Sequence, residues 1–243
     1  MLENHKQNYL KRTGYSSMSI KAMLFDMDGV LFDSMPNHAT SWIESTKAFG
    51  LSMDRKEAYM NEGRTGASTI NEIALRTWNR EATELEIKQI YAKKTEIFNQ
   101  CPLAPPMSGA WQVLQKAKQA GLKIVLVTGS GQKTLLDRLN RNFPGIFTPD
   151  NMVTAYDVKY GKPNPEPYLI ALQKAGVQAN EAIVVENAPL GVRAGVAANI
   201  FTLAVNTGPL PDSVLIGEGA DALFPSMLYL SDNFDVLMLD LDK

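Results

Sequence analysis

The stretch "KAMLFDMDGVLFDSMPNH", residues 21–38, decides the fold of this chain. Its apolar run from Ala22 to Phe25 has the length and composition of a buried strand, and two aspartates, Asp26 and Asp28, follow directly after it. Two carboxylates this close repel each other, so each is costly to keep ionised beside the other. The pair therefore raises the question of what offsets that cost.

Three further apolar runs suit buried strands: residues 122–128, 182–186 and 200–205. Amphipathic, helix-like segments separate them, beginning near residue 104. Strands that are apolar throughout and alternate with helices predict a parallel sheet covered on both faces. We therefore expect the α/β class, with a Rossmann-like parallel sheet core to which the run at 22–25 adds one more strand.

Residues 35 to about 100 interrupt this alternation, because they contain no strand-like run and several amphipathic helical patterns. A proline-rich segment, residues 101–106, reads as the linker that returns to the sheet. We predict a discontinuous core over residues 20–34 and 104–243, and an inserted helical cap over residues 35–103. The polar residues 1–19 are expected to be a flexible N-terminal extension.

The composition excludes several classes of protein. The net charge of −2 gives no basic excess for nucleic acid, and no apolar run reaches the roughly 18 residues of a membrane span. The single cysteine, Cys101, cannot form an intramolecular disulfide. We expect a cytoplasmic monomer with no nucleic-acid or membrane partner.

Polar residues follow the predicted strands where ligands bind in open parallel sheets, beyond the carboxyl ends of the strands. The sequence offers the acid pair, a strand end at Thr128 followed by Gly129 and Ser130, a loop with Lys162, and the pair Glu186 and Asn187. Each alone is commonly a turn, a solvated lysine or a helix cap. Their joint occurrence, in this order and at strand ends, argues against a purely structural role.

Oxygen ligands of this kind suit Mg²⁺, which needs a few of them and keeps some waters. Asp26, the carbonyl of Asp28, Asn187 and Glu186, the last through water, could supply them. The cation would remove the penalty for crowding the carboxylates and shield a phosphoryl group from an attacking anion.

The remaining roles follow from charge. Asp26 can act as a nucleophile and form an aspartyl-phosphate, while Asp28 can give a proton to the leaving oxygen and later take one from water. Lys162 would pair with Asp26 and balance the phosphoryl oxygens. Thr128 and the amides that follow it, those of Gly129 and Ser130, would donate hydrogen bonds to the same oxygens.

Four motifs, "FDMDGVLFDS", "VTGS", "GKPNPEPY" and "VVENAPLGVRAGVAA", resemble in order those of the haloacid dehalogenase superfamily of phosphohydrolases. The helical insertion directly after the first motif resembles the cap of its beta-phosphoglucomutase-like branch. The resemblance implies an Asp26 nucleophile, an Asp28 acid/base, a requirement for Mg²⁺, a cap that opens and closes, and hydrolysis of phosphate esters.

Two departures from that branch narrow the expected substrate. The fourth motif usually carries two acids, whereas here Asn187 follows Glu186. In the cap loop, Glu62 and Gly66 stand where the sugar-phosphate mutases have a lysine and an arginine. This pattern resembles that of an inorganic pyrophosphatase of the same branch, so the sequence predicts hydrolysis of pyrophosphate. The alternatives are a sugar-phosphate phosphatase or beta-phosphoglucomutase and, from another class, a non-catalytic metal- or phosphate-binding module.

Three cap residues complete the predicted substrate site. His38 matches the place of a mutase histidine that couples substrate binding to closure. Arg64 and Lys94 could contact the leaving group, although either could equally be a solvated cap charge.

Overall fold

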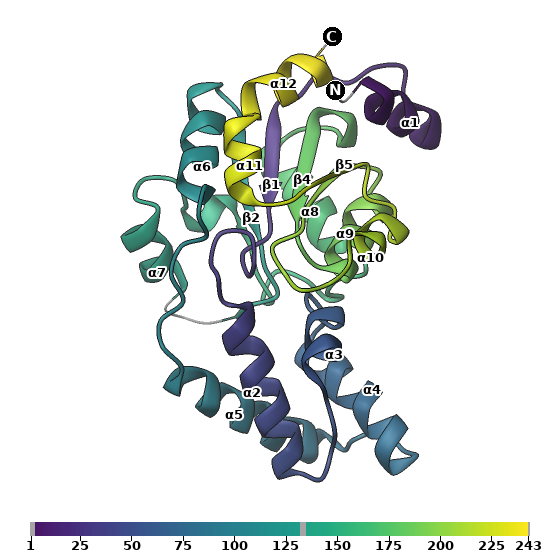
Figure 1. The fold of residues 1–243 in the computed structure, drawn as a ribbon, viewed down its shortest axis with the longest axis vertical. Coiled ribbons are helices and arrows are strands. Elements are labelled where there is room, and N and C mark those ends of the chain that lie inside the picture. Colours follow the sequence, from purple (N-terminus) through teal and green to yellow (C-terminus); the bar gives the residue numbers. More distant parts are fainter. Residues whose placement is uncertain (1–2, 132–134, 243) are drawn as a thin grey trace.

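The computed structural model describes residues 3–131 and 135–242 (Figure 1). Its described residues form one six-stranded sheet in the order β3-β2-β1-β4-β5-β6, and every neighbouring pair is parallel. The predicted α/β fold with a Rossmann-like parallel sheet is therefore confirmed. The strands are β1 (Ala22–Phe25), β2 (Lys123–Val127), β3 (Met152–Val153), β4 (Ala182–Glu186), β5 (Phe201–Val205) and β6 (Ala222–Phe224).

The register of the central strands positions the site. Phe25, the last residue of β1, pairs with Leu126 of β2 on one side and with Val185 of β4 on the other. The three strands therefore end at nearly the same level, and the residues that follow them meet at one edge of the sheet. The short strands β3 and β6 were not predicted, because two or three residues carry too little pattern.

Both faces of the sheet are covered, as its continuous apolar strands require. Met23 and Phe25 of β1 face a large core, whereas Ala22 and Leu24 face a second cluster. The helices on the first face are α6 (Ala110–Gln119), α7 (Leu135–Asn142), α11 (Met227–Asp232) and α12 (Phe234–Asp242). The second face carries α8 (Glu166–Ala175) and α9 (Pro189–Ala197), and the short helices α10 (Asp212–Gly217), η1 (Pro149–Asn151) and η2 (Ala179–Glu181) complete the described core.

Four helices fill most of the segment for which a cap was predicted: α2 (Met35–Ala48), α3 (Arg55–Met60), α4 (Gly66–Trp78) and α5 (Glu84–Gln100). They form a separate group beyond the carboxyl edge of the sheet (Figure 1). This group has its own apolar cluster, which includes Trp42, Ile70, Ile73 and Ile90. Because the cap buries its own core, it can meet the sheet edge mainly through polar residues.

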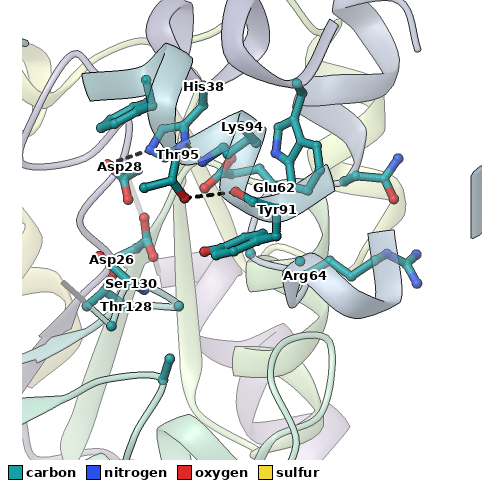
Figure 2. A pocket seen from close by; sticks show the side chains of 18 of the residues that line it. Asp26, Asp28, His38, Glu62, Arg64, Tyr91, Lys94, Thr95, Thr128 and Ser130 are labelled. Carbon is teal, nitrogen blue, oxygen red and sulfur yellow. Dashed lines mark hydrogen bonds and ion pairs between the residues drawn. The ribbon is translucent and has the colours of Figure 1, made fainter. Parts of the chain in front are cut away.

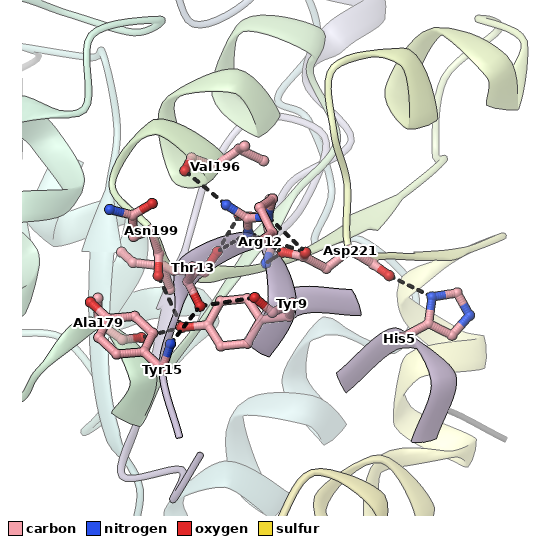
Figure 3. A network of polar contacts seen from close by, with 11 residues as sticks. His5, Tyr9, Arg12, Thr13, Tyr15, Ala179, Val196, Asn199 and Asp221 are labelled. Carbon is pink, nitrogen blue, oxygen red and sulfur yellow. Dashed lines mark hydrogen bonds and ion pairs between the residues drawn. The ribbon is translucent and has the colours of Figure 1, made fainter. Parts of the chain in front are cut away.

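The prediction of a flexible N-terminal extension is wrong for residues 3–13. They form helix α1 (Glu3–Thr13), and Tyr9 is fully buried in the main core. The Tyr9 hydroxyl donates a hydrogen bond to the carbonyl of Asn199 at 2.9 Å, and the Arg12 guanidinium pairs with Asp221 at 2.8 Å (Figure 3). A polar helix with a single aromatic anchor carries too little apolar periodicity to be recognised from sequence. Some residues of the predicted segments lie outside the described part of the chain. They are residues 1–2 of the predicted extension and residues 132–134 and 243 of the predicted core.

The C-terminal stretch, which the sequence left unassigned, forms α11 and α12. Their apolar residues Met227, Leu230, Leu237 and Leu241 are buried against the sheet. Of the helices that the structure describes, none has the length and apolarity needed to span a membrane.

Arg12→Ala should lower the free energy of unfolding by about 1 kcal/mol, because it removes an ion pair and hydrogen bonds to the carbonyls of Val196 and Ile200. Thermal and denaturant unfolding would measure this loss. Lys11→Ala, the exposed neighbour, is the matched control and should leave stability unchanged. Equal stability of the two variants would show that α1 is not fastened through Arg12.

Candidate active site

The acid pair lies in a closed turn after β1. Asp26 and Asp28 are each only 6% exposed, and the amide of Asp26 continues the ladder by donating to the carbonyl of Val185 at 3.0 Å. The amides of Leu31 and Phe32 both donate to the carbonyl of Met27, which folds the chain back sharply. Both carboxylates are therefore held at the sheet edge by backbone hydrogen bonds.

Lys162 supplies the positive charge that this buried pair needs. Its Nζ lies 2.5 Å from Oδ1 of Asp26 and 2.6 Å from Oε1 of Glu186, and it also donates to the carbonyl of Val127. Burial acts to lower the pKa of Lys162, but the two carboxylates outweigh it and hold that pKa well above its ordinary value. The predicted pairing of Lys162 with Asp26 is present.

The ionised form of Asp26 remains unfavourable despite its pairing with Lys162. Burial raises the pKa of Asp26 to about 8, with Lys162 opposing the rise and the carboxylates of Glu186 and Asp28 adding to it. Its second oxygen, Oδ2, is buried and has no hydrogen-bond partner among the described residues. One further positive group at this oxygen would favour the ionised form.

Glu186 is occupied by the protein itself. Its Oε1 accepts hydrogen bonds from Lys162 and from the hydroxyl of Tyr168 at 2.9 Å, and its Oε2 accepts from the amides of Asn187 and Ala188. Both oxygens are thus engaged in holding Lys162 and the start of α9. Tyr168, which the sequence reasoning missed, stands in the stretch "GKPNPEPY" that was quoted as a motif.

The donor set for a cation is better met by Asn187 than by Glu186. The side-chain oxygen of Asn187 is buried and unpaired among the described residues, like Oδ2 of Asp26, and an unpaired buried polar atom is costly. In the described part of the chain, no three His, Cys, Asp or Glu side chains gather as a metal site. A cation here would use two side-chain oxygens, from Asp26 and Asn187, and the carbonyl predicted at Asp28, which is a donor set that suits Mg²⁺.

The loop after β2 lies beside the acids, as predicted. Thr128, Gly129 and Ser130 line the same cavity as Asp26 (Figure 2). The amide of Thr128 donates to the carbonyl of Val153, and the amide of Ser130 donates to Oγ1 of Thr128 at 3.1 Å. The loop is therefore a compact turn whose hydroxyl and amide groups border the nucleophile candidate.

The cap reaches the second acid through His38. Nε2 of His38 lies 3.3 Å from Oδ1 of Asp28, and Nδ1 of His38 lies 3.0 Å from Nζ of Lys94. Because the ammonium of Lys94 can only donate, Nδ1 accepts and Nε2 carries the proton toward Asp28. Burial and Lys94 lower the pKa of His38, which agrees with this neutral form.

Asp28 is held in its ionised form. Burial alone would raise its pKa, but His38, the hydroxyl of Ser34 at 2.5 Å and Arg138 outweigh burial and lower the pKa of Asp28 to about 2. The two acids of the first motif therefore have opposite shifts. In the unliganded site this favours an ionised Asp28 and a protonated Asp26, the reverse of what an acid and a nucleophile need, and a cation at Oδ2 of Asp26 would favour the ionised form of Asp26.

The cavity between cap and core has a volume of about 410 Å³. Glu62, from the loop between α3 and α4, lines it together with both aspartates. Burial, Asp28 and Asp26 raise the pKa of Glu62 well above its ordinary value, and Lys94 opposes this rise. Figure 2 shows Glu62 beside Lys94 on the cap side of the cavity.

Arg64 is the predicted site residue that the structure does not bring to the acids. Its backbone borders the cavity, but its guanidinium pairs with Glu72 at 2.9 Å and contacts the hydroxyl of Ser68. In Figure 2 it points away from Asp26. This orientation argues against its prediction as a substrate contact.

Aromatic side chains form a further part of the cap wall, and the sequence analysis did not assign them to the site. Trp42 belongs to the cap core and also lines the cavity. Tyr91 and Phe98 of α5 lie beside it and surround the ammonium of Lys94, which is 4.9 Å from the centre of the Phe98 ring. Tyr91, Lys94 and Phe98 lie about one helical turn apart along α5, so the same face of this helix borders the cavity.

The fold, the order of the strand-end residues and the cap define a class of phosphohydrolase. Residues 20–199 match the family of haloacid dehalogenase-like hydrolases, and the chain belongs to that family.

Two similar proteins are named as phosphatases of carbohydrates or polyols. Hexitol phosphatase A of Escherichia coli is 32% identical over 190 residues, which cover 78% of this chain and 84% of that protein. The phosphorylated carbohydrates phosphatase of Thermotoga maritima is 29% identical over 208 residues, which cover 84% of this chain and 94% of that protein.

A solved structure from Bacteroides vulgatus, described as a candidate beta-phosphoglucomutase, has a TM-score of 0.97 and 61% identity. The match covers 100% of this chain and 98% of that one. Resemblance to the beta-phosphoglucomutase-like branch is thus shown, whereas no comparison shows resemblance to an inorganic pyrophosphatase.

Proposed function

We propose that the chain is a Mg²⁺-dependent phosphatase of small phosphorylated molecules, with Asp26 as its nucleophile. The observation that carries the proposal is the buried Asp26, which is paired through one oxygen with Lys162, has its other oxygen unpaired, and borders the cavity. A carboxylate held in this way can take a cation at its unpaired oxygen while its other oxygen attacks a phosphorus atom. The ion pair with Lys162 fixes its orientation.

The first step forms one bond and breaks one. An oxygen of Asp26 bonds to phosphorus, the bond from phosphorus to the leaving oxygen breaks, and the leaving oxygen takes a proton from Asp28. Asp28 must hold that proton when the substrate is bound, which requires the substrate to displace part of its contact with His38. Thr128, Lys162 and the amides of Gly129 and Ser130 would stabilise the phosphoryl oxygens during transfer.

The second step returns the enzyme to its starting state. Asp28, now ionised, takes a proton from water, and the water oxygen attacks phosphorus. The bond to Asp26 breaks and inorganic phosphate is released. The low pKa of Asp28 in the unliganded site favours the ionised form that this step starts from.

Mg²⁺ would be held by Asp26, Asn187 and the carbonyl of Asp28. When bound, it neutralises charge that develops on the phosphoryl oxygens. Glu186 would serve as the partner that holds Lys162 in place.

The relatives support a phosphorylated sugar or polyol as substrate. The cavity, about 410 Å³, falls within the roughly 300–1,000 Å³ of small-molecule sites. Glu62 can accept hydrogen bonds from hydroxyl groups, and the aromatic wall at Trp42 and Phe98 can contact the carbon face of a sugar. We therefore place a hydroxyl-rich leaving group on the cap side.

Inorganic pyrophosphate, the prediction from sequence, is the second candidate. Glu62 favours it over a mutase substrate, because a carboxylate repels a free distal phosphate but can hold one through a cation. Arg64, the arginine whose backbone borders the cavity, directs its guanidinium to Glu72 rather than to a second phosphate. The same pairing speaks against beta-phosphoglucomutase activity.

A phosphate-release panel tests both candidates. It compares hexitol phosphates and hexose 1- and 6-phosphates with pyrophosphate, with Mg²⁺ and after its removal by a chelator. We expect a carbohydrate phosphate to lead, and chelation to abolish release. Glu62→Ala should lower kcat/KM for the leading carbohydrate phosphate by at least about tenfold, because a hydrogen-bonding partner of the substrate hydroxyl groups is lost.

Glu84→Ala, an exposed acid at the start of α5, is the matched control. If pyrophosphate leads by orders of magnitude and Glu62→Ala removes that lead, the second candidate replaces the first. If no phosphorylated compound releases phosphate above background, the chain is the non-catalytic binding module and the proposal is wrong.

A further inference from the structure

Two tyrosines line the cavity from different parts of the fold. Tyr91 comes from α5 of the cap, and Tyr156 comes from the core loop that follows β3. Tyr91 is 43% exposed and Tyr156 is 76% exposed, so both rings lie where the cavity meets solvent. The steps proposed above use neither of them.

Tyr91 is supported by a close contact across the cap. A Cβ atom added to Gly66, the first residue of α4, would lie 2.4 Å from the ring of Tyr91. The ring therefore lies directly on this glycine, which belongs to the same cap loop as Glu62. Trp42 packs beside it, with 6.3 Å between ring centres. In Figure 2 the ring of Tyr91 lies between the Asp26 and Ser130 side of the cavity and Arg64.

Tyr156 is built in the same way on the core side. A Cβ atom added to Gly131 would lie 3.1 Å from Cζ of Tyr156, so this ring lies against the end of the phosphate-binding loop. The turn that carries it is fixed, because Asp157 accepts hydrogen bonds from the amide and the hydroxyl of Thr154 at 2.8 and 2.7 Å. The ring is therefore exposed but its backbone is held.

Tyr156 also separates two spaces. On one side is the 410 Å³ cavity, and on the other is a surface pocket of about 240 Å³. Both spaces are lined by Ser130, Gly131 and Tyr156. Removing the Tyr156 ring would join them and lengthen the cavity toward solvent.

The two phenols face a common space. Burial raises the pKa of Tyr91, and the phenol of Tyr156 and the carboxylate of Asp28 raise it further. Among the described residues, neither hydroxyl has a hydrogen-bond partner. A substrate at Asp26 and Asp28 would extend its leaving group into the space that these rings border.

We propose that Tyr91 and Tyr156 act as specificity-determining residues that limit the size of the leaving group. This inference rests on the proposed phosphatase function and adds to it the residues that set the upper limit on substrate size. A small leaving group passes between the rings without contact, whereas a bulky one meets them. Replacing either ring with a methyl group enlarges the space and relaxes the limit.

The test compares three substrates that transfer the same phosphoryl group from leaving groups of different size: acetyl phosphate, glucose 6-phosphate and p-nitrophenyl phosphate. Tyr156→Ala and Tyr91→Ala should each raise the ratio of kcat/KM for p-nitrophenyl phosphate to that for acetyl phosphate by about tenfold or more. Tyr156→Phe and Tyr91→Phe keep the rings and should keep the wild-type ratio. Tyr160→Ala, an exposed tyrosine of the same core loop outside this cavity, is the matched control.

Each outcome decides one claim. Wild-type hydrolysis of acetyl phosphate tests the proposed function, and the ratio tests the size limit. A Tyr156→Ala ratio equal to that of Tyr160→Ala overturns the inference while leaving the phosphatase intact. Because Tyr156 is exposed, its alanine variant decides the question even if Tyr91→Ala fails to fold.

Discussion

Asp26→Asn should abolish turnover of every substrate in the panel, lowering kcat by roughly 10⁴-fold or more, the scale seen when a covalent nucleophile is removed. The amide of asparagine keeps the shape of the carboxyl group but cannot attack phosphorus. The expected loss lies in kcat, because the loop after β2 and the cap are unchanged. Steady-state kinetics with Mg²⁺ would measure it.

The same variant should remain folded, and its stability gives a second readout. The pKa of Asp26 is raised to about 8, so its ionisation costs stability as the pH rises from the ordinary carboxyl value toward 8. Asparagine removes that cost, so Asp26→Asn should gain stability relative to wild type as the pH rises to 8 in the absence of divalent cations. Thermal unfolding across this range, with a chelator present, would show it.

Asp33→Asn provides the control, since Asp33 is an exposed aspartate seven residues further along the same segment. It should retain near wild-type kcat. Near wild-type turnover by Asp26→Asn would contradict the aspartyl-phosphate mechanism, whatever the stability of the variant.

Much of the sheet could be predicted because its inner strands are continuous apolar runs. The apolar runs at residues 122–128 and 182–186 predict β2 and β4. Because the strands are parallel, Asp26, Thr128 and Glu186 then lie at the same edge of the sheet. No comparable signal exists for β3, which has two residues and owes its place to the neighbouring β2. Tertiary pairing, not local pattern, decides such elements.

Within the site, the sequence predicted which residues come together better than it predicted their hydrogen-bond and ion-pair partners. The sequence placed Glu186 and Asn187 together, but only the structure shows that Glu186 gives its oxygens to Lys162, Tyr168 and two amides while the oxygen of Asn187 stays unpaired. Arg64 is a similar case, because the structure pairs its guanidinium with Glu72 of α4, a partner that the sequence did not indicate. Which partner a polar side chain takes depends on distances in the folded structure, and these distances cannot be read from spacing in the sequence.

Lys162→Met should be the most destabilising single change at the site. Lys162 is 3% exposed and joins Asp26 and Glu186, so its removal leaves two buried carboxylates without their cation. Breaking a buried ion pair from one side costs about 3 to 5 kcal/mol. Turnover should fall by about 10² to 10³-fold or more, since a donor to the phosphoryl oxygens is lost as well. Denaturant unfolding and kinetics would measure the two effects.

The pH dependence of that loss identifies its cause. Without Lys162 the pKa of Asp26 loses the charge that opposes its rise, and a raised carboxyl pKa gives stability at low pH that is lost as the pH rises. Lys162→Met should therefore be closer to wild type at pH 5 than at pH 8. Adding Glu186→Gln removes one of the unpaired charges, so the double variant should regain stability at pH 8 without regaining turnover.

Lys159→Met, an exposed lysine of the same loop, should change neither stability nor its pH dependence. If Lys162→Met loses stability equally at both pH values, and Glu186→Gln restores none of it, then lost packing rather than unpaired charge is the cause. Something other than Lys162 would then have to offset the cost of keeping Asp26 and Asp28 ionised side by side. If the pH dependence appears as expected, the buried lysine is what allows the acid pair to exist at the end of β1.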